Sequence, residues 1–361
     1  MADKARVAVI GTGWWSTTAH IPGLQANPDA ELVALADVRP EALEAAKAKY
    51  GAIKTYTDYR EMLANEQLQG VVVCVNHAAH YEVAKACLDA GLHVMLDKPM
   101  VLFARDAHDL ANTAKSCGVE LIVGYPWNYT EITRRARDII QSGELGEIQY
   151  VSSLFTSMVI EFLRGKSENY QQTFNYVVTG PRNVYSDPKL SGGGQGHLQV
   201  THSAGALFFV TDLQADVVTS FMQNFDLLVD VAGAIAVQFK PVRNGYAPVG
   251  VLGTTANIGM GDSGHLEVQV YGEKGRLVLD EVQSTLYVRK HDGTEQRFGP
   301  LPAEARYPLF DPANNLVDII LGRGTNGSPA EVGVKVVELL DAAYRSAGSG
   351  GQPVRVGDLL S

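Results

Sequence analysis

A short segment near the N-terminus has the residue types and the spacing of a loop that binds phosphates: Gly11-Thr12-Gly13-Trp14-Trp15-Ser16. It follows an apolar stretch and opens a segment with helical periodicity. The first glycine permits a tight turn, and the second lets a pyrophosphate approach the backbone closely. The N-terminus of the following helix supplies amide donors and a favourable dipole. We therefore expect a bound dinucleotide, contacted by Gly11, Thr12, Gly13, Trp14 and Trp15, with the small Ser16 where a third glycine is usual.

An acidic residue, Asp37, ends the second apolar stretch. A carboxylate at this place accepts hydrogen bonds from the hydroxyls of an adenosine ribose, which favours NAD over NADP. Arg39 bears on the same choice, because a nearby arginine accommodates a 2′-phosphate if Asp37 turns away. The alternative role for Asp37 is that of a helix cap ahead of Pro40. The order of strand, glycine loop, helix and acid favours the cofactor interpretation.

The elements that must position these residues repeat regularly up to residue 123. Helical segments alternate with short apolar stretches, and the clearest helix begins at Pro40 and stops at Gly51. The apolar stretches have the character of strands buried on both faces of a parallel sheet: 7–10, 32–36, 71–75, 94–96 and 121–123. This alternation predicts an α/β fold, with a doubly wound Rossmann domain over residues 1–123.

Residues 124–361 follow a different pattern. Pairs of strand-like stretches flank turn sequences such as Asn244-Gly245 and Gly272-Glu273-Lys274-Gly275, which indicates successive hairpins. Helical periodicity appears at about 129–142 and at about 330–347. We therefore expect an α+β domain built on an open, mainly antiparallel sheet.

The composition argues against several classes of protein. The 361 residues include 30 basic and 40 acidic side chains, and the net charge is −10. Nucleic acids and anionic membranes need a concentrated basic surface, so we expect neither as a partner. No apolar run approaches membrane-spanning length and the N-terminus leads directly into a strand, so we expect a cytoplasmic protein. Cys74, Cys87 and Cys117 lack metal-ligand spacing and are expected to be reduced thiols.

Further signatures follow in a fixed order along the chain: Ala36-Asp37-Val38, Asp97-Lys98-Pro99, Val123-Gly124-Tyr125, the stretch 135–148, and Gly192-Gly193-Gly194 followed by His202. Together they resemble the Gfo/Idh/MocA oxidoreductase family over essentially the whole chain. Asp97 stands where the family has a glutamate, and Asn76-His77 stands where Thr-Pro is more usual. The resemblance implies hydride transfer between NAD(P) and a secondary alcohol of a sugar, polyol or derivative. It also implies that residues 124–361 bind the substrate and form an oligomer interface, so we expect a homodimer or homotetramer.

Lys98 ends the fifth predicted strand, at the edge of the sheet where ligands of open α/β domains bind. Beside a nicotinamide, a lysine donates a hydrogen bond to the substrate oxygen and stabilises developing alkoxide charge. Partial burial and the positive ring would lower its pKa and allow it to shuttle a proton. A solvated lysine at a strand end is the alternative, and the family motif favours the catalytic role.

His202 corresponds to the family histidine that takes the proton of the substrate hydroxyl. Many relatives carry an acid four residues earlier, and Leu198 occupies that place here. His197 is a further candidate for the missing polar function, and Gln199 matches a variant pattern in which an amide follows that position. The alternative for His202 is a buried core histidine at the start of a helix.

The remaining expected contacts lie at the ends of the fourth, fifth and last strands of the first domain and in a later loop. Asn76, His80, Asp97 and Lys98 are expected at the cofactor. Aromatic faces and amide groups suit pyranose rings, although aromatic side chains more often fill protein cores. On this ground we expect substrate contacts from Tyr125, Trp127, Asn128, Arg182, Tyr185 and Gln199. His77 and His80 have no third ligand of suitable spacing, so we expect no metal.

Two other functions stay open. A retained NAD that takes and returns a hydride would support a redox-neutral elimination or epimerisation, including glycosidase-type cleavage. A non-catalytic NAD-dependent sensor is the other alternative. Leu198 favours the sensor, whereas Lys98 and His202 argue against it.

Overall fold

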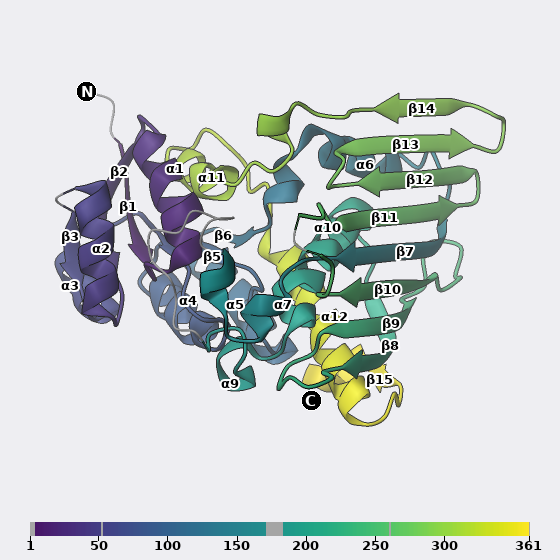
Figure 1. The fold of residues 1–361 in the computed structure, drawn as a ribbon. Coiled ribbons are helices and arrows are strands. Elements are labelled where there is room, and N and C mark those ends of the chain that lie inside the picture. The colour runs from purple at the N-terminus through teal and green to yellow at the C-terminus, as the bar shows by residue number, and fades with distance from the viewer. Residues whose placement is uncertain (1–3, 52, 171–182, 260, 361) are drawn as a thin grey trace.

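The computed structural model describes residues 4–51, 53–170, 183–259 and 261–360 (Figure 1). Its strands form two sheets, one parallel and one mainly antiparallel. Helices cover both faces of the first sheet and one face of the second. This arrangement confirms the expected fold class, an α/β Rossmann unit joined to an α+β unit.

Six parallel strands make up the first sheet, in the order β3-β2-β1-β4-β5-β6. They are β1 (Ala5–Ile10), β2 (Ala30–Ala36), β3 (Lys54–Tyr56), β4 (Gly70–Val73), β5 (His93–Asp97) and β6 (Leu121–Gly124). β4 and β6 are buried throughout, and β1 and β5 nearly so. Such strands need apolar side chains on both faces, which is why their sequences are apolar runs without alternation.

Side chains of these strands alternate between two helical layers. One layer is formed by α1 (Ile21–Ala26), α2 (Pro40–Tyr50) and α11 (Asp311–Ile320), the other by α3 (Tyr59–Asn65), α4 (His80–Asp89) and α5 (Ala104–Cys117). α11 comes from late in the sequence, yet its Leu316 and Val317 pack with Val72 and Met95 of the first sheet. The first sheet ends at Gly124, beside the predicted boundary, but its covering layer is completed by a helix from the second unit.

Nine strands make up the second sheet, in the order β14-β13-β12-β11-β7-β10-β9-β8-β15. They are β7 (Ile148–Thr156), β8 (Ala215–Gln223), β9 (Ala232–Phe239), β10 (Val249–Thr255), β11 (His265–Gly272), β12 (Gly275–Asp280), β13 (Thr285–Lys290), β14 (Glu295–Phe298) and β15 (Val354–Arg355). Neighbours are antiparallel except for β7 and β10, which run parallel. The hairpin signals located β9 to β14, whereas β7 and β8 lie outside any hairpin signal and were not predicted.

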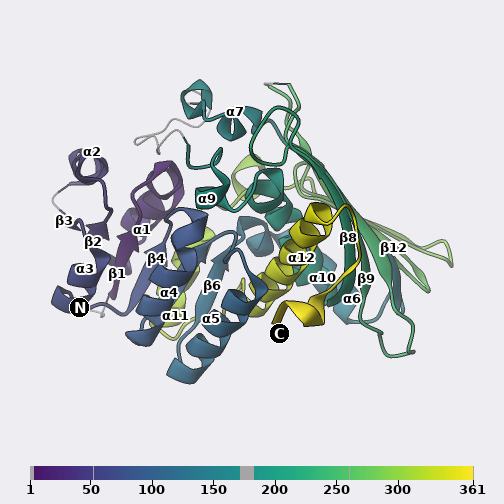
Figure 2. The same cartoon turned by 90° about the horizontal axis from the view of Figure 1, so that it is seen from below.

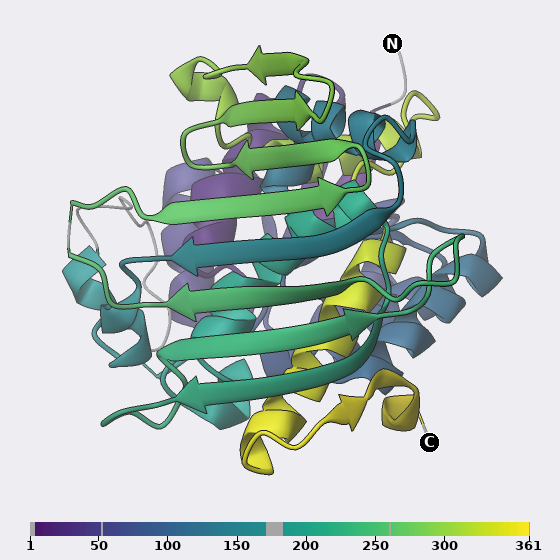
Figure 3. The same ribbon diagram turned by 90° about the vertical axis from the view of Figure 1, so that its right-hand side faces the viewer.

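One face of this sheet is covered and the other is open (Figure 3). In β11, Leu266, Val268 and Val270 are buried, and the residues between them are only partly so. The buried side chains face α6 (Glu131–Gln141), α10 (Thr201–Thr211) and α12 (Ala330–Gly348), which lie between the two sheets (Figures 1 and 2). The alternation is the pattern of a sheet with helices on one side.

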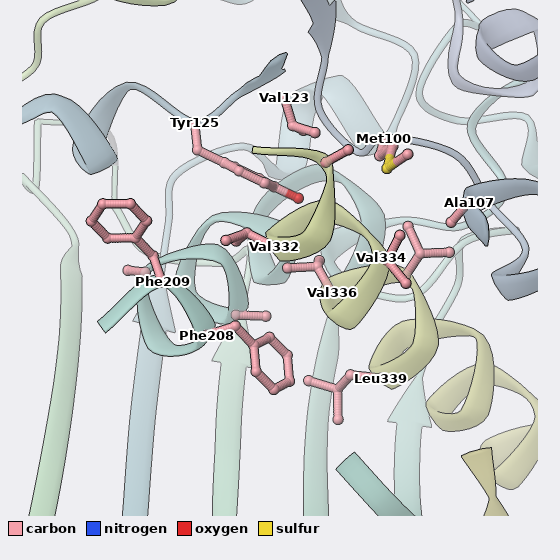
Figure 4. Close-up of a cluster of buried hydrophobic side chains, with 14 of the residues drawn as sticks. Met100, Ala107, Val123, Tyr125, Phe208, Phe209, Val332, Val334, Val336 and Leu339 are labelled. Atoms are coloured by element: carbon pink, nitrogen blue, oxygen red, sulfur yellow. The ribbon is translucent and has the colours of Figure 1, made fainter. Parts of the chain in front are cut away.

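A continuous hydrophobic core joins the two units where α10 and α12 meet the first sheet (Figure 4). Phe208 of α10 and Val336 of α12 belong to it, together with Tyr125, which follows β6. Short helices α7 (Ile160–Leu163) and α9 (Pro188–Ser191) precede the π-helical turn Gly196–Val200 that leads into α10. This core holds the carboxyl ends of β4 and β5 against the start of α10.

Candidate active site

The turn after β1 packs closely against the neighbouring strand end and leaves its other side open. Gly11 has φ +94°, and a Cβ there would lie 2.2 Å from the carbonyl oxygen of Cys74, so only glycine fits. A Cβ at Gly13 would meet nothing within 4 Å, which leaves open space above the backbone. Ser16 is buried and its hydroxyl donates to the Gly11 carbonyl at 2.6 Å, so it closes the turn where a third glycine is usual.

Asp37 receives donors from two directions. The backbone N–H of Thr12 donates to Oδ2 at 2.8 Å, and the Arg39 side chain donates to both carboxylate oxygens at 3.1 Å. Burial alone would raise the pKa of the Asp37 carboxyl. The hydrogen bonds and charge of Arg39 and the Thr12 amide outweigh that effect and lower the pKa below its usual value. Asp37 is therefore an ionised acceptor, and it does not cap α2, whose Arg39 N-cap makes no side-chain hydrogen bond.

A single cavity of about 740 Å³ connects this turn to the carboxyl ends of the strands and to the start of α10. Most of the predicted site residues line it. These are Gly11, Gly13, Trp14, Trp15, Asp37, Arg39, Asn76, Asp97, Lys98, Trp127, Tyr185, Gln199 and His202. Residues from both units thus face one space, as expected at the carboxyl edge of an open α/β sheet.

Lys98 follows β5 and reaches across the cavity to the second unit. Its Nζ donates to the carbonyl oxygen of Leu198 at 2.9 Å. Burial lowers the pKa of Lys98, and the neighbouring Asp97 carboxylate opposes that shift. Asp97 also accepts the backbone N–H of Lys98 at 2.8 Å, which fixes the start of the segment after the strand.

His202 lies on α10 with aromatic rings on several sides. Its ring meets that of Trp127 edge-on, with centroids 5.3 Å apart. Among the described residues, Nδ1 of His202 has no hydrogen-bond partner. Burial and the charge of Lys98 hold the pKa of His202 well below its ordinary value, so the ring is neutral at pH 7. A neutral imidazole that lines the cavity is suited to accept a proton.

Leu198 occupies an apolar setting, which explains how the chain accommodates it. Its side chain packs in a cluster with Phe162, Tyr170 and Val229. An acid here would be buried among these groups. The polar contact at this position comes instead from the backbone carbonyl of Leu198, which accepts a hydrogen bond from Lys98.

His197 is placed away from the cavity. Its ring stacks on Tyr344 of α12 with centroids 4.4 Å apart, and neither ring nitrogen has a partner among the described residues. Burial lowers its pKa to about 3. The structure thus separates His197 from Lys98 and His202, and its predicted catalytic role gains no support from its position.

The glycine run before α10 approaches protein rather than ligand. A Cβ at Gly193 would lie 2.2 Å from the Tyr344 hydroxyl oxygen, and one at Gly194 would lie 2.0 Å from the carbonyl oxygen of Asp230. The Asp230 carboxylate accepts the N–H of Gly194 at 2.6 Å and the Tyr344 hydroxyl at 2.7 Å. The run therefore anchors the start of α10 to α12.

Four other predicted residues stand behind the cavity wall. Thr12 acts through Asp37, as described above. Both ring nitrogens of His80 lie at carbonyl oxygens, Pro99 at 2.8 Å and Val75 at 3.1 Å, so His80 joins the ends of β4 and β5. The hydroxyl of Tyr125 pairs with that of Thr201 at 3.0 Å, and Asn128 donates to Ser328 at 3.1 Å. Arg182 lies outside the described residues.

Several lining residues were not predicted. His77 lines the cavity and its Nδ1–H donates to the Ser191 carbonyl at 2.9 Å. Phe155, Phe162, Glu281, Arg306 and Tyr307 also line it, and they come from the second sheet and the segments around it. None of these five belongs to a motif, because each reaches the cavity only through the packing of the second unit.

Three groups with metal-ligand chemistry also lie together beneath Lys98. Ligand atoms of His20, Cys74 and Asp97 are within 4.8 Å of one another. They come from three segments, so sequence spacing gave no sign of the group. The Cys74 thiol donates to Asp97 at 3.4 Å, and burial, the largest effect, raises the pKa of that thiol. A protonated thiol is a poor metal ligand, so we assign no metal to this group.

Comparison with known proteins shows which family the first unit resembles. Residues 5–125 match the model of the Gfo/Idh/MocA oxidoreductase family, described as an NAD-binding Rossmann fold. Residues 5–125 thus belong to the NAD-binding unit of the Gfo/Idh/MocA oxidoreductase family. The Rossmann unit is therefore an NAD-binding domain, as predicted.

The proteins that match this chain include two dehydrogenases whose names state a substrate. D-Glucoside 3-dehydrogenase of Escherichia coli is 33% identical over 42% of this chain and 43% of its own length. Myo-inositol 2-dehydrogenase of Thermotoga maritima is 30% identical over 39% of this chain and 42% of its own length. The chain thus matches less than half the length of these two dehydrogenases.

The fold extends over the whole chain. The WlbA dehydrogenase from Bordetella pertussis, solved in complex with NADH and UDP-GlcNAcA, superposes with a TM-score of 0.74. The superposition covers 98% of each chain at 22% sequence identity. Among the described residues, no helix has both the length and the apolar character needed to cross a membrane.

Proposed function

We propose that this protein is an NAD-dependent oxidoreductase that transfers a hydride between a secondary hydroxyl of a sugar, glycoside or cyclitol and the nicotinamide. The observation that carries the proposal is the single cavity, which joins the glycine turn and Asp37 to Lys98 and His202. Cofactor-binding groups and proton-transfer groups face the same space, as the reaction requires.

The residues at one end of the cavity fit NAD. The open space at Gly13 admits a pyrophosphate against the N-terminus of the helix that begins there. The ionised Asp37 is an acceptor for ribose hydroxyls. Its pairing with Arg39 keeps that arginine from presenting itself to a 2′-phosphate, which supports NAD over NADP. When bound, NAD supplies the hydride acceptor, and the protein supplies binding and orientation.

Lys98 and His202 divide the proton transfer between them. One N–H of Lys98 is used by the Leu198 carbonyl, which leaves two donors for the substrate oxygen. A lysine held this way stabilises alkoxide character as the hydroxyl is oxidised. The neutral ring of His202 accepts the hydroxyl proton. In the reverse direction, the same groups return a proton to the carbonyl oxygen.

Aromatic and amide groups support a carbohydrate or cyclitol as substrate. Trp127 lines the cavity beside His202, and Tyr185 and Gln199 line it as well. Flat aromatic faces suit the C–H faces of pyranose rings, and amides suit their hydroxyls. The names of the two matched dehydrogenases, which specify a glucoside and an inositol, support the same class.

The test is turnover with NAD and a panel of glucosides, free pyranoses and inositols, followed by NADH absorbance and by product analysis in parallel. Growth of absorbance with one compound, and formation of its ketone, would establish the reaction and its substrate class. Product formation without absorbance growth would replace the proposal by the redox-neutral alternative. Tight binding of NAD with no conversion of any compound would favour the sensor.

One observation favours the redox-neutral alternative as a second candidate. Trp14 of the dinucleotide turn donates to the Tyr185 hydroxyl at 3.0 Å and stacks on Phe162 at 5.4 Å. All three residues line the cavity, so these contacts tie the dinucleotide turn to the second unit and favour a retained cofactor. Nucleotide that stays with the purified protein through gel filtration would support this candidate, and nucleotide-free protein would count against it.

We also propose that the protein is a homodimer or homotetramer in the cytoplasm. The open face of the second sheet exposes Leu154, Val249 and Val251, which need cover in water. Cys74, Cys87 and Cys117 are free thiols, which suits a reducing compartment.

A further inference from the structure

Glu281 is a carboxyl group that the proposed chemistry leaves unused. It follows β12 directly, forms part of the cavity wall with Val282, and has no exposed surface. Its backbone N–H donates to the Leu266 carbonyl at 2.9 Å, which fixes the main chain at this point. An ionised carboxylate in such a place is costly unless cations or several donors surround it.

The Glu281 carboxyl begins a chain of hydrogen-bonding groups. The Thr133 hydroxyl oxygen on α6 lies 2.8 Å from one carboxyl oxygen and 3.0 Å from the other. The Thr130 hydroxyl oxygen lies 2.7 Å from that of Thr133. It also lies 3.1 Å from the carbonyl oxygen of Trp127, to which it donates. These hydrogen-bonding groups therefore connect Glu281 to the backbone of Trp127, the aromatic residue beside His202.

The number of protons available sets the direction in which these hydrogen bonds run. Each threonine hydroxyl has one proton to donate. If Thr130 donates to the Trp127 carbonyl, Thr133 must donate to Thr130. The contact between Glu281 and Thr133 then needs a proton from Glu281. If Glu281 is ionised, Thr133 donates to it and Thr130 turns to Thr133. The Trp127 carbonyl then loses its hydroxyl donor and keeps the backbone N–H of Thr130, at 3.1 Å.

The surroundings of Glu281 favour the protonated form. Burial, with a smaller effect from the negative charge of Asp280, raises its pKa to about 8, and the Thr133 contact opposes this shift. No cation forms an ion pair with Glu281 within the described part of the chain. Across the cavity, the ring of His202 is neutral.

The charged side chains on neighbouring elements are engaged elsewhere or reach solvent. Glu131 and Asp138 of α6 are exposed, and Glu267 of β11 pairs with Gln269. The others have the following partners: Arg134 over Tyr129, Arg135 over Phe298, Arg137 over Phe209, Arg276 over Tyr287, His265 with Asp280, Arg289 with Glu295, and Lys290 with Glu144.

Trp127 is the residue whose position these hydrogen bonds control. Its ring meets both His202, at 5.3 Å between centroids, and Tyr307, at 4.7 Å. We propose that Glu281 is a positioning residue, which donates its carboxyl proton through Thr133 and Thr130 and so holds Trp127 as a wall of the substrate site. The proposal rests on the proposed function for its kinetic consequence. Ionisation of Glu281 reverses the direction in which the Thr133 and Thr130 hydroxyls donate. Trp127 is then held less firmly beside the substrate site.

The kinetic test compares the unaltered protein with Glu281→Gln between pH 6.5 and 9.5, using methyl glucoside or the compound of the panel that is turned over, at saturating NAD. The amide of glutamine donates to Thr133 at every pH. We expect the KM of the unaltered protein to rise above pH 8, by up to about tenfold, the loss expected for one hydrogen bond. The KM of Glu281→Gln should stay level over the same range, with kcat changing in parallel in both.

Glu281→Leu and Glu131→Gln complete the kinetic series. Leucine cannot donate, so its KM should be raised at every pH, whereas the exposed Glu131 on the same helix should leave the pH profile unchanged. Parallel KM profiles for the unaltered protein and Glu281→Gln would overturn the positioning role.

A melting experiment tests the proton without any substrate. Because the pKa of Glu281 is higher in the folded state than its ordinary value of 4.5, rising pH removes stability from the unaltered protein between about 4.5 and 8. The melting temperature of Glu281→Gln minus that of the unaltered protein should therefore increase from pH 5 to pH 8. A constant difference would overturn the proposal. Lack of turnover with every compound would count against the proposed function, and the melting series would still show whether Glu281 holds its proton.

Discussion

At the scale of single residues, burial and partner together set the protonation state of each group in the cavity. Asp37 is buried but surrounded by donors, and its pKa falls. Lys98 is partly buried and His202 is buried, both with few compensating contacts, and their pKa values fall as well. The same cause, desolvation, therefore makes it easier for Lys98 to give up a proton and keeps the His202 ring unprotonated at neutral pH.

Replacing Lys98 by alanine removes the donor to the substrate oxygen. We expect kcat with the identified substrate to fall by at least about a hundredfold, in keeping with the loss of a general acid–base group. The dissociation constant for NAD, measured by calorimetry, should change only a few-fold. Lys85→Ala, which removes a partly exposed lysine paired with Asp89 on α4, is the matched control. A Lys98→Ala protein with full activity would contradict the assignment.

Replacing Asp37 by alanine tests the choice of cofactor. The change removes the ribose acceptor and frees Arg39 from its ion pair. We expect the KM for NAD to rise by about tenfold and the KM for NADP to fall, because the released guanidinium can meet a 2′-phosphate. The measurement is the ratio of kcat/KM for the two cofactors. An unchanged ratio would show that Asp37 does not contact the ribose.

At the scale of elements, two glycines in one turn serve different purposes. Gly11 is required by the fold, because its φ is positive and Cys74 leaves no room for a Cβ. Gly13 has free space around it and an ordinary φ, so the fold alone tolerates a larger residue there. In the turn between β1 and the first helix, Gly11 is therefore required for folding, whereas Gly13 is expected to matter for cofactor binding.

Gly13→Ala should fold with a melting temperature close to that of the unaltered protein, because its Cβ meets nothing within 4 Å. Its affinity for NAD should fall by at least about tenfold, since the methyl group fills the space that the pyrophosphate needs. Gly11→Ala is the contrasting variant, and it should be strongly destabilised. Unchanged NAD affinity in Gly13→Ala would place the pyrophosphate elsewhere.

At the scale of the whole molecule, the second sheet has one face on helices and one face open (Figure 3). On the open face, Leu154 is 44% exposed, Val249 47% and Val251 42%, and they lie on the adjacent strands β7 and β10. Covering this face by a second copy would remove apolar surface from water and hold the sheet rigid behind the cavity.

Val251→Glu should shift the protein toward the monomer, because the proposed interface would then bury a charge. Light scattering after gel filtration gives the mass of each species. Leu228→Glu, in the loop between β8 and β9 and 75% exposed, changes an apolar residue away from the strands and should keep the oligomer. A monomeric unaltered protein, or an oligomer unaffected by Val251→Glu, would contradict the proposed interface.

The local patterns of the sequence were sufficient for the Rossmann unit and the hairpins of the second sheet. Apolar runs, a glycine turn and a following acid each express a short-range requirement, such as burial on two faces or a positive φ. Gly11, Asp37 and Lys98 could therefore be named in advance, since each lies at a strand end that the sequence itself marks. The family resemblance added His202, which no local pattern distinguishes from His197.

Only the tertiary structure decided which residues share the cavity. It separated His202 from His197, because the Asp230 and Tyr344 side chains hold the start of α10 in one orientation. It also brought Glu281 to the cavity wall, although that residue belongs to no motif and lies far along the chain from Lys98. The physical reason is that strand, turn and cap signals act over a few residues. The protonation state of a buried group, in contrast, depends on neighbours that come together only when both sheets have packed around one core.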